Sequence, residues 1–284
     1  MNLVPKMPVF DVLSASDMEA YIPQSTRSLA LMAAYDSQPN HICPNLIKYL
    51  KELASEFEVV LLLTNERPLA PSVIEQLPAS CRVKCVPNLL LDFGMWARVL
   101  QSPTFPTTIE HIGLFNDSCY LVHSLSAIFT HAKNHGYEFW GLVKNDEIAT
   151  HLQSFFLVAE RNAVPKLLSF FKSKDMAALS SIDKGTLIHT FEVGLSLYMS
   201  QQGTPLQSVY SLQTLHGKPP TSLHKWKGIR AIRHINLSYS HWDTLLSLGC
   251  PLLKKNRASF NRAPEEAAYI RTNVDVDLWP TISI

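Results

Sequence analysis

Residues 58–65 read EVVLLLTN, an almost wholly apolar run that ends on two small polar residues. A run of this length and composition is typical of a strand buried on both faces in the middle of a parallel sheet. The run SLALMAAYD at residues 28–36 has the same character. Between the two lies NLIKYLKELASEF (residues 45–57), whose leucines recur at helical spacing. This strand–helix–strand order predicts a parallel pair of strands with a covering helix.

The alternation continues along the first half of the chain. After residue 65 the pattern predicts a helix at 73–77, a strand at 82–88, a helix from near Asp92, a strand at 112–117 and a helix at about 124–135. The expected fold class is therefore α/β, with a central, mostly parallel sheet flanked by helices. The second half is more mixed: it predicts strands at 138–142 and 151–160, and helices at 164–173 and 191–203.

The domain organisation follows from the same pattern. We expect one domain over residues 28–258, because no internal repeat or low-complexity linker divides this stretch. Residues 1–27 contain Pro and Ser with weak periodicity and are expected to be an N-terminal arm. Residues 259–284 carry little pattern and are expected to be a C-terminal tail.

The composition excludes several classes of protein. Hydrophobic residues make up 46% and charged residues 17% of the chain, which is not the composition of a disordered protein. The formal charge of +1 gives no strong electrostatic reason to bind nucleic acid. Five scattered cysteines are expected to be reduced. No signal peptide or apolar run of about 18 residues is present, so a cytoplasmic protein is expected, one that could rest on the inner face of the membrane.

Small polar residues follow the predicted strands. In open parallel sheets, ligands bind beyond the carboxyl ends of the strands. Such side chains suit ribose hydroxyls, a base edge or a metal-bridged diphosphate, although Asn and Asp here could instead cap the following helices. Asp117 is the best candidate to hold Mg²⁺ or Mn²⁺, or else a sugar hydroxyl. The residues at the strand ends are Tyr35, Asp36, Thr64, Asn65, Asn88, Asn116, Asp117 and Ser118.

Further along the chain, Glu192 could deprotonate an acceptor hydroxyl as a general base. The alternative is a carboxylate placed favourably in the first turn of a helix. His151, Gln153 and Ser154 lie in the segment HLQSFF, and polar residues in an apolar strand indicate a lined cavity or, alternatively, a hydrogen-bonded core histidine.

One long stretch carries no acidic residue. It runs from Val193 to Trp242 and contains the basic residues Lys218, Lys225, Lys227, Arg230 and Arg233. Such a stretch could receive phosphate from a nucleotide or from a lipid-diphosphate glycan. A solvated loop is the alternative.

Six segments together resemble the rhamnan synthesis protein F family of polysaccharide glycosyltransferases. They are NLLLDFGMW (88–96), LFNDSCY (114–120), EFWGL (138–142), HLQSFF (151–156), FEVGLS (191–196) and NLSYSHWDTLLSLGCPLLKK (236–255). They occur in the order expected for that family, so the resemblance covers most of residues 28–258.

The resemblance implies a function and a fold. It implies transfer of rhamnose or a related sugar from a nucleotide-sugar during O-antigen, capsule or rhamnan assembly, with a fold similar to the nucleotide-diphosphosugar transferase type called GT-A. In that comparison the segment FNDS takes the place of the donor-binding motif, and Glu192 resembles the acceptor-activating acid of inverting enzymes. Two departures stand out: Leu89–Leu90–Leu91 replaces a stretch that often contains Gly, and Leu121–Val122–His123 replaces a Gly-Pro type continuation.

These observations together define a predicted site. Glu192 and Asp117 are the expected catalytic residues, with Asp117 also the candidate ligand of Mg²⁺ or Mn²⁺. The expected partners are a nucleotide-sugar donor and a saccharide or lipid-linked glycan acceptor. The alternative function is a non-catalytic carbohydrate-binding subunit of a polysaccharide assembly complex. The residues expected to bind donor are Tyr35, Asp36, Asn88, Asp92, Gly94, Asn116, Ser118 and Lys254, and those expected to bind acceptor are Trp140, His151, Gln153 and Ser154.

Overall fold

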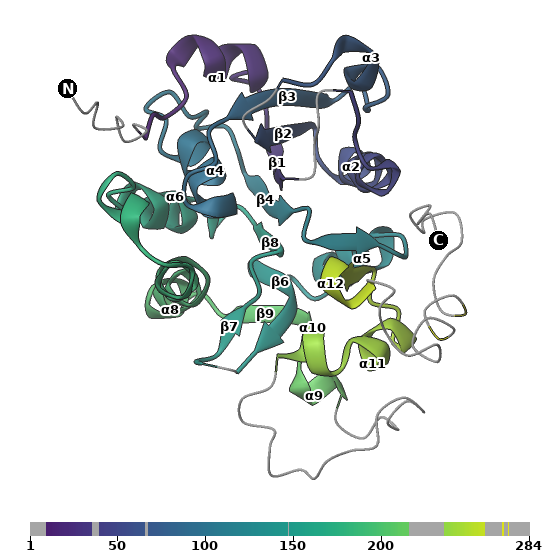
Figure 1. The fold of residues 1–284 in the computed structure, drawn as a ribbon. Coiled ribbons are helices and arrows are strands. Elements are labelled where there is room, and N and C mark those ends of the chain that lie inside the picture. The colour runs from purple at the N-terminus through teal and green to yellow at the C-terminus, as the bar shows by residue number, and fades with distance from the viewer. Residues whose placement is uncertain are drawn as a thin grey trace, which may run out of the picture.

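The computed structural model describes residues 10–35, 40–65, 68–146, 148–215, 236–258, 269 and 272. One mixed sheet forms its centre, with the strand order β3-β2-β1-β4-β8-β6-β7, and β9 pairs with β6 (Figure 1). Its strands are β1 (Ser28–Ala34), β2 (Val59–Asn65), β3 (Cys81–Val86), β4 (His111–Asn116), β6 (Phe139–Asn145), β7 (His151–Leu152), β8 (Phe156–Ala159) and β9 (Leu206–Tyr210).

The first four strands in sequence lie parallel to one another. β1 pairs with both β2 and β4, and β2 pairs with β3. The direction then changes, because β8 inserts antiparallel between β4 and β6. The predicted α/β class, a central sheet that is mostly parallel and flanked by helices, is confirmed. All four parallel strands present their carboxyl ends at one edge, as the site prediction requires.

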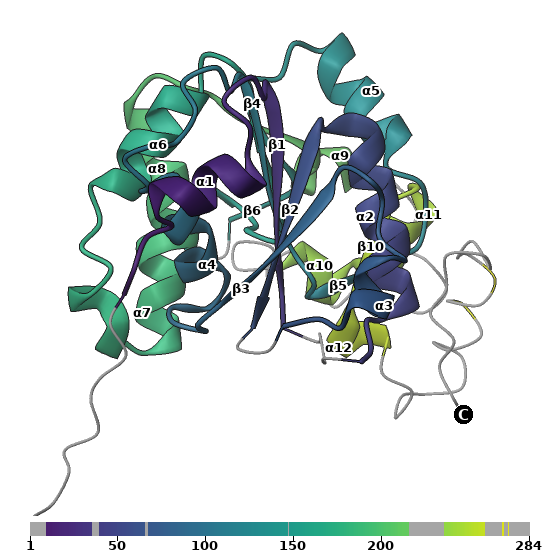
Figure 2. The same cartoon turned by 90° about the horizontal axis from the view of Figure 1, so that it is seen from above.

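Helices cover both faces of the sheet (Figure 2). The helices on one face include α1 (Ala15–Tyr21), α4 (Leu91–Leu100), α6 (Val164–Lys172), α7 (Lys184–Ile188) and α8 (Gly194–Gln201). Those on the other face include α2 (Pro44–Glu56), α3 (Pro71–Ile74), α5 (Ser126–Asn134), α9 (Leu212–Leu215), α10 (Leu237–Ser240) and α11 (Trp242–Ser247).

Side-chain alternation in the central strands supplies both cores. In β1, Leu29 and Leu31 point into the core under α4 and α6, whereas Ala30 and Met32 point into the core under α2 and α5. A strand covered on both faces has no polar face, which explains the unbroken apolar runs in the sequence. In α2, the predicted stripe of Leu46, Leu50 and Leu53 is buried, and Pro44 at the first turn suits its missing N–H.

The predicted N-terminal arm contains structure that belongs to the domain. Met18 in α1 and Ile22 just after it are fully buried in the core beside α4. The backbone N–H of Leu13 donates to the carbonyl of Arg98 in α4 at 2.8 Å. Within the described residues, therefore, residue 28 is not a packing boundary.

The second half differs in detail from the sequence prediction. The single strand expected at 151–160 is two strands, β7 and β8, because residues 153–155 turn between them. The helix expected at 191–203 begins instead as α7, passes through a π-helical turn (His189–Val193) and continues as α8. Strand β9 was not predicted.

A short ladder joins the C-terminal segment to the edge of the sheet. Strand β10 (Leu252–Lys254) pairs antiparallel with β5 (Cys119–Leu121), so Lys254 lies opposite Cys119. Helix α12 (Lys255–Ala258) follows at once. None of the helices in the described part of the chain has the length and apolar character needed to cross a bilayer.

Candidate functional site

The segment Asn116–Asp117–Ser118 directly follows β4 and is fixed by hydrogen bonds. Asn116 Nδ2 donates to Asp92 Oδ2 at 2.6 Å. Asn116 Oδ1 accepts from Ser118 N at 3.1 Å and from Ser118 Oγ at 2.6 Å. The backbone N–H of Asp117 donates to the carbonyl of Ala33 at the end of β1, at 3.0 Å. The segment therefore links β1, β4 and the start of α4.

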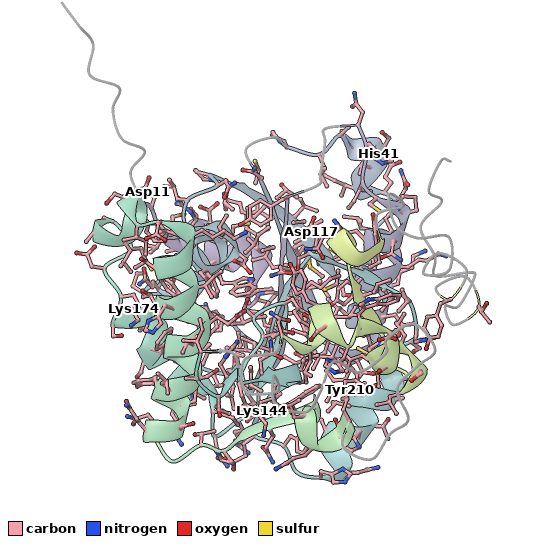
Figure 3. The ribbon with its side chains drawn as sticks, turned by 60° about the horizontal axis from the view of Figure 1, so that its bottom comes forward. Asp11, His41, Asp117, Lys144, Lys174 and Tyr210 are labelled. Carbon is pink, nitrogen blue, oxygen red and sulfur yellow. The ribbon has the colours of Figure 1, made fainter. Side chains whose placement is uncertain are left out.

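Two lysines from the C-terminal segment reach the same place. Lys254 Nζ donates to Ser118 Oγ at 3.1 Å and lies 4.3 Å from the centre of the Phe155 ring. Lys255 Nζ lies 3.3 Å from Asp117 Oδ2, and the Asp117 side chain is only 6% exposed. Figure 3 shows Asp117 beside the helix that begins at Lys255. The site therefore has two cations next to the polar segment that follows β4.

Four buried polar atoms lie at the same edge without a hydrogen-bond partner in the described structure. They are the Tyr35 hydroxyl after β1, Thr64 Oγ1 and Asn65 Oδ1 at the end of β2, and Asn88 Oδ1 after β3. More than nine in ten buried polar groups in proteins are hydrogen-bonded. Four unused groups at the ends of three adjacent strands indicate a place where a polar ligand binds.

Glu192 lies in the π-helical turn before α8 and is held by two neighbours. Its Oε2 accepts from the backbone N–H of Ser154 at 2.7 Å. Its Oε1 is 3.4 Å from His151 Nε2, and His151 Nδ1 is 2.8 Å from the carbonyl of Ala149. The histidine ring is thus held between a carbonyl and the carboxylate, and Glu192 is fixed in position.

Two carboxyls of the site, Asp92 and Glu192, have opposite pKa shifts. Burial raises the pKa of Asp92 to about 6; the hydrogen bond from Asn116 opposes the shift, and the charge of Glu192 adds to it. Burial also raises the pKa of Glu192, but hydrogen bonds from His151 and Ser154 outweigh burial, so its pKa lies below the ordinary value. Of these two, Asp92 is the one whose pKa lies nearer to neutral pH.

The electrostatic interactions also show that these residues form one site. Glu192 and Lys254 both act on the pKa of Asp92. Burial, with smaller effects from the charges of Asp92 and Asp117, raises the pKa of the Tyr35 hydroxyl well above its usual value, so Tyr35 is a hydrogen-bond donor at neutral pH. Charged groups separated by up to 162 residues in sequence thus converge at the carboxyl edge of the sheet.

The structure brings most of the predicted site residues together and separates a few. The residues that converge are Tyr35, Asp92, Asn116, Asp117, Ser118, His151, Ser154, Glu192 and Lys254, with Asn88 at the neighbouring strand end. Asp36 and the basic residues of 216–235 lie outside the described residues. The site also contains Lys255, which was not predicted.

Gln153 and Trp140 do not join this group. Gln153 Nε2 donates to Asn236 Oδ1 at 3.1 Å, because the turn after β7 directs its side chain toward α10. Trp140 lies near the start of β6, paired with Val158, whereas His151 pairs with Asn145 at the other end of that strand. The Trp140 ring is fully buried among Phe129, Tyr137 and Phe156 and has no free face for a sugar at this site.

Gly94 has a packing role beside the site. A Cβ at this position would lie 1.7 Å from the carbonyl oxygen of Leu89, so only glycine allows the loop to approach α4. Leu90 and Leu91 in that loop have φ values of 63° and 55°, a left-handed backbone that favours glycine. Strain of this kind occurs preferentially at functional sites, and here it sets the entry to α4 directly before Asp92.

The residues do not form a ready-made centre for Mg²⁺ or Mn²⁺. No cluster of three His, Cys, Asp or Glu side chains suited to a metal occurs among the described residues. Of the two carboxylates near Tyr35, Asp117 faces Lys255 and Asp92 accepts from Asn116. The two lysines add positive charge at the same edge.

Comparisons with known proteins find distant similarities in structure but no match in sequence. No protein-family model matches the sequence, and no curated protein matches it. Similar solved structures include a Bacillus anthracis protein assigned as a glucose-1-phosphate thymidylyltransferase, with 6% identity and a TM-score of 0.43 over 64% of this chain and 87% of that one. Another is a 4-diphosphocytidyl-2C-methyl-D-erythritol synthase from Anaerococcus prevotii, with 6% identity and a TM-score of 0.40 over 64% and 88%. A cytidylyltransferase from Leptospira borgpetersenii has 16% identity and a TM-score of 0.34 over 58% and 72%.

Proposed function

We propose that the chain is a glycosyltransferase that moves a sugar from a nucleotide-sugar donor to a saccharide acceptor. The observation that carries the proposal is the set of unpartnered buried polar atoms after β1, β2 and β3, next to Asn116–Asp117–Ser118 and two lysines. Nucleoside hydroxyls and base edges would occupy the unused donors and acceptors, and the lysines would face the diphosphate. The resemblance of the six segments favours rhamnose or a related sugar and a growing bacterial surface polysaccharide.

The proposed reaction is an inverting displacement at the anomeric carbon. An acceptor hydroxyl oxygen forms a bond to that carbon while the bond from the carbon to the diphosphate oxygen breaks. The hydroxyl proton passes to a carboxylate, and the nucleoside diphosphate leaves with an added negative charge. Lys254 and Lys255 stabilise that charge, because fixed cations in a water-poor site need little reorganisation.

We assign the proton acceptor to Asp92 rather than to Glu192. A general base works best when its pKa lies near the working pH, and the raised pKa of Asp92 meets this condition. Both oxygens of each carboxyl have a partner, but, despite burial, the pKa of Glu192 is lowered by hydrogen bonds from His151 and Ser154, so Glu192 is the weaker base. Its role is to position the loop that carries Ser154 and to raise the pKa of Asp92 by its charge.

Dependence on a divalent ion is part of the proposal to be tested. Asp117 is the group that would contact Mg²⁺ or Mn²⁺ if the donor brings the ion with its diphosphate, since carboxylate oxygen suits both. Such an ion would supply further positive charge at the leaving group.

The experiment is turnover of a panel of nucleotide-sugars, with and without Mg²⁺ or Mn²⁺, followed by release of the nucleoside diphosphate. Lys254→Met is expected to lower turnover of the active donor about 100-fold, since removing one fixed charge-stabilising group typically costs that much. Lys172→Met, an exposed lysine in α6, is the matched control and is expected to leave turnover unchanged. Oligosaccharide binding without turnover of any donor would instead favour a non-catalytic carbohydrate-binding subunit.

A further inference from the structure

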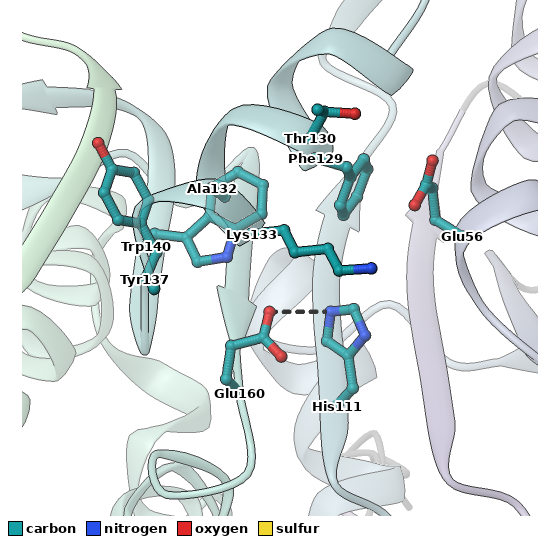
Figure 4. Close-up of a pocket in the computed structure, with 10 residues that line it drawn as sticks. Glu56, His111, Phe129, Thr130, Ala132, Lys133, Tyr137, Trp140 and Glu160 are labelled. Carbon is teal, nitrogen blue, oxygen red and sulfur yellow. Dashed lines mark ion pairs between the residues drawn. The ribbon is translucent and has the colours of Figure 1, made fainter.

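An open cavity of about 520 Å³ lies at the opposite end of the sheet from Asn116 (Figure 4). It is found where β4 and β6 begin, just after β8, and near the last turns of α2 and α5. Strand β4 runs from His111 at this cavity to Asn116 at the proposed donor site, so the two places lie roughly 17 Å apart at ~3.3 Å per residue. The polar and aromatic groups that define its chemistry are Glu56, His111, Lys133, Tyr137, Trp140 and Glu160.

The lining combines groups that only accept hydrogen bonds with groups that only donate. The carboxylates of Glu56 and Glu160 accept, whereas the Lys133 ammonium and the Trp140 indole N–H donate. Burial raises the pKa of Glu160, and a hydrogen bond of poor geometry from the Trp140 indole N–H opposes that rise, so this donor is only weakly used. The cavity therefore offers unused hydrogen-bonding capacity of both kinds.

His111 adds an uncharged side chain to the lining of the cavity. Its Nε2 lies 3.4 Å from Glu160 Oε1, the dashed line in Figure 4, without forming a hydrogen bond of normal geometry. Burial lowers the pKa of His111 to about 4, so the ring is uncharged at neutral pH and one of its nitrogens can accept.

The chemistry of this lining selects one class of ligand. A phosphate would be repelled by the carboxylates of Glu56 and Glu160. An ammonium group could pair with the carboxylates but accepts no hydrogen bond, so it would offer nothing to the Lys133 ammonium. A hydroxyl both donates and accepts, so a hydroxyl-rich ring can bond to both kinds of group. The side chains of Phe129 and Tyr137 supply an apolar wall, and the volume lies in the range of small-molecule sites, about 300–1,000 Å³.

We propose that this cavity binds a saccharide, at a site separate from the reacting centre. The binding does not depend on the proposed function. If the chain also transfers sugars, the distance between the two sites means that the cavity holds a remote unit of a long acceptor rather than the sugar being transferred.

The test is ligand-observed NMR titration with methyl rhamnoside and sucrose as probes, with inorganic phosphate and ethanolamine as comparison ligands. The wild-type chain is expected to bind at least one saccharide probe. Glu160→Gln is expected to weaken that binding about tenfold, because a hydrogen bond to a charged acceptor is lost. Lys133→Met is expected to weaken it to a similar degree.

Glu110→Gln is the matched control. The Glu110 and Glu160 side chains are each 38% exposed, and Glu110 pairs with Arg161, the residue after Glu160, but Glu110 does not line the cavity. Glu110→Gln should bind the saccharide as the wild type does, and equal melting temperatures of the three variants would show that each one folds.

Several results would overturn the proposal. They are no saccharide binding by the wild type, binding that Glu160→Gln and Lys133→Met leave unchanged, or binding of phosphate or ethanolamine that these variants abolish. Saccharide binding lost in Asp92→Asn but kept in Glu160→Gln would assign the saccharide to the other edge and would also contradict it. Donor turnover is a separate readout, so failure here is distinguishable from failure of the proposed transferase activity.

Discussion

The two ends of strand β4 hold different kinds of polar group. At the carboxyl end, Asp92 and Asp117 are buried and each has a partner, Asn116 for one and Lys255 for the other. At the amino end, Glu160 is partly exposed and faces His111 at 3.4 Å without a hydrogen bond of normal geometry. The carboxyl end of β4 therefore holds buried carboxylates that each have a partner. The amino end lines an open cavity whose side chains include both hydrogen-bond donors and acceptors.

The difference follows from the direction of the strands. Four parallel strands bring their carboxyl ends to one edge, where the chain leaves each strand and can present a polar side chain. The antiparallel insertion of β8 brings Glu160 to the opposite edge, beside the first residue of β4. A mixed sheet can thus carry polar groups at both of its edges, with separate roles.

The largest expected effect is on stability at the carboxyl end. Gly94→Ala should lower the free energy of unfolding by about 3 kcal/mol or more, because its Cβ would overlap the Leu89 carbonyl oxygen and displace the loop before Asp92. Urea unfolding measures the change. Gly185→Ala, in the exposed helix α7, should change the free energy by no more than about 1 kcal/mol. Equal effects of the two substitutions would show that the Gly94 contact is not tight in solution.

The next effect concerns the division of roles between the two carboxyls. Asp92→Asn is expected to lower sugar transfer about 100-fold, the usual contribution of a general base. Glu192→Gln should cost less and should move the acidic limb of the pH–rate profile to lower pH, because loss of its negative charge lowers the pKa of Asp92. The measurement is the sugar-transfer rate of the wild type and both variants from pH 4 to 8. A larger loss in Glu192→Gln, with no shift of the limb, would return the base role to Glu192.

A smaller effect concerns stability against pH. The folded-state pKa of Asp92, about 6, lies above its unfolded value of 3.8, so the native state binds the extra proton between these pH values. Stability from this group is therefore lost as the pH rises from about 4 to about 6, at up to about 1.4 kcal/mol per pH unit. Asp92→Asn should gain stability relative to the wild type over this window, measured by urea unfolding at each pH. A constant difference would mean that the Asp92 pKa is not raised.

The smallest effect is expected at the exposed ion pair near the amino end. Arg161 Nη2 lies 3.0 Å from Glu110 Oε1, but the Arg161 side chain is 77% exposed. Solvent screens such pairs, so Arg161→Ala should change the free energy of unfolding by less than about 1 kcal/mol. Thermal unfolding at low and high salt measures it. A change of several kcal/mol would show that this edge is more tightly organised than the structure indicates.

The first half of the fold was predictable because its central strands β1, β2 and β4 are buried on both faces. The apolar runs at β1, β2 and β4 and the stripe of α2 leave little choice of element, and parallel alternation then fixes where their ends meet. The polar residues at those ends could therefore be named from sequence. In the second half, short strands such as β7 and β9 depend on pairing with β6, which no local pattern specifies.

The missed residues of the site depend on long-range contacts. Lys255 reaches Asp117 only because β10 pairs with β5, a register that the sequence does not reveal. The choice between Asp92 and Glu192 as base depends on how deeply each carboxyl is buried and on its hydrogen bonds. The spacing of residues in the sequence reveals neither. Trp140 and His151 were both expected to bind acceptor, but Trp140 lies near the start of β6, whereas His151 pairs with Asn145 at the other end of that strand.

The most direct test of the central claim is amide hydrogen exchange with and without a nucleotide-sugar that the chain turns over. The account predicts new protection at residues 88–93 and 116–118, at the carboxyl edge, and none at residues 130–137 or at Glu160. Protection confined to the cavity at the amino end, or no change at residues 116–118 with a saturating donor, would contradict it.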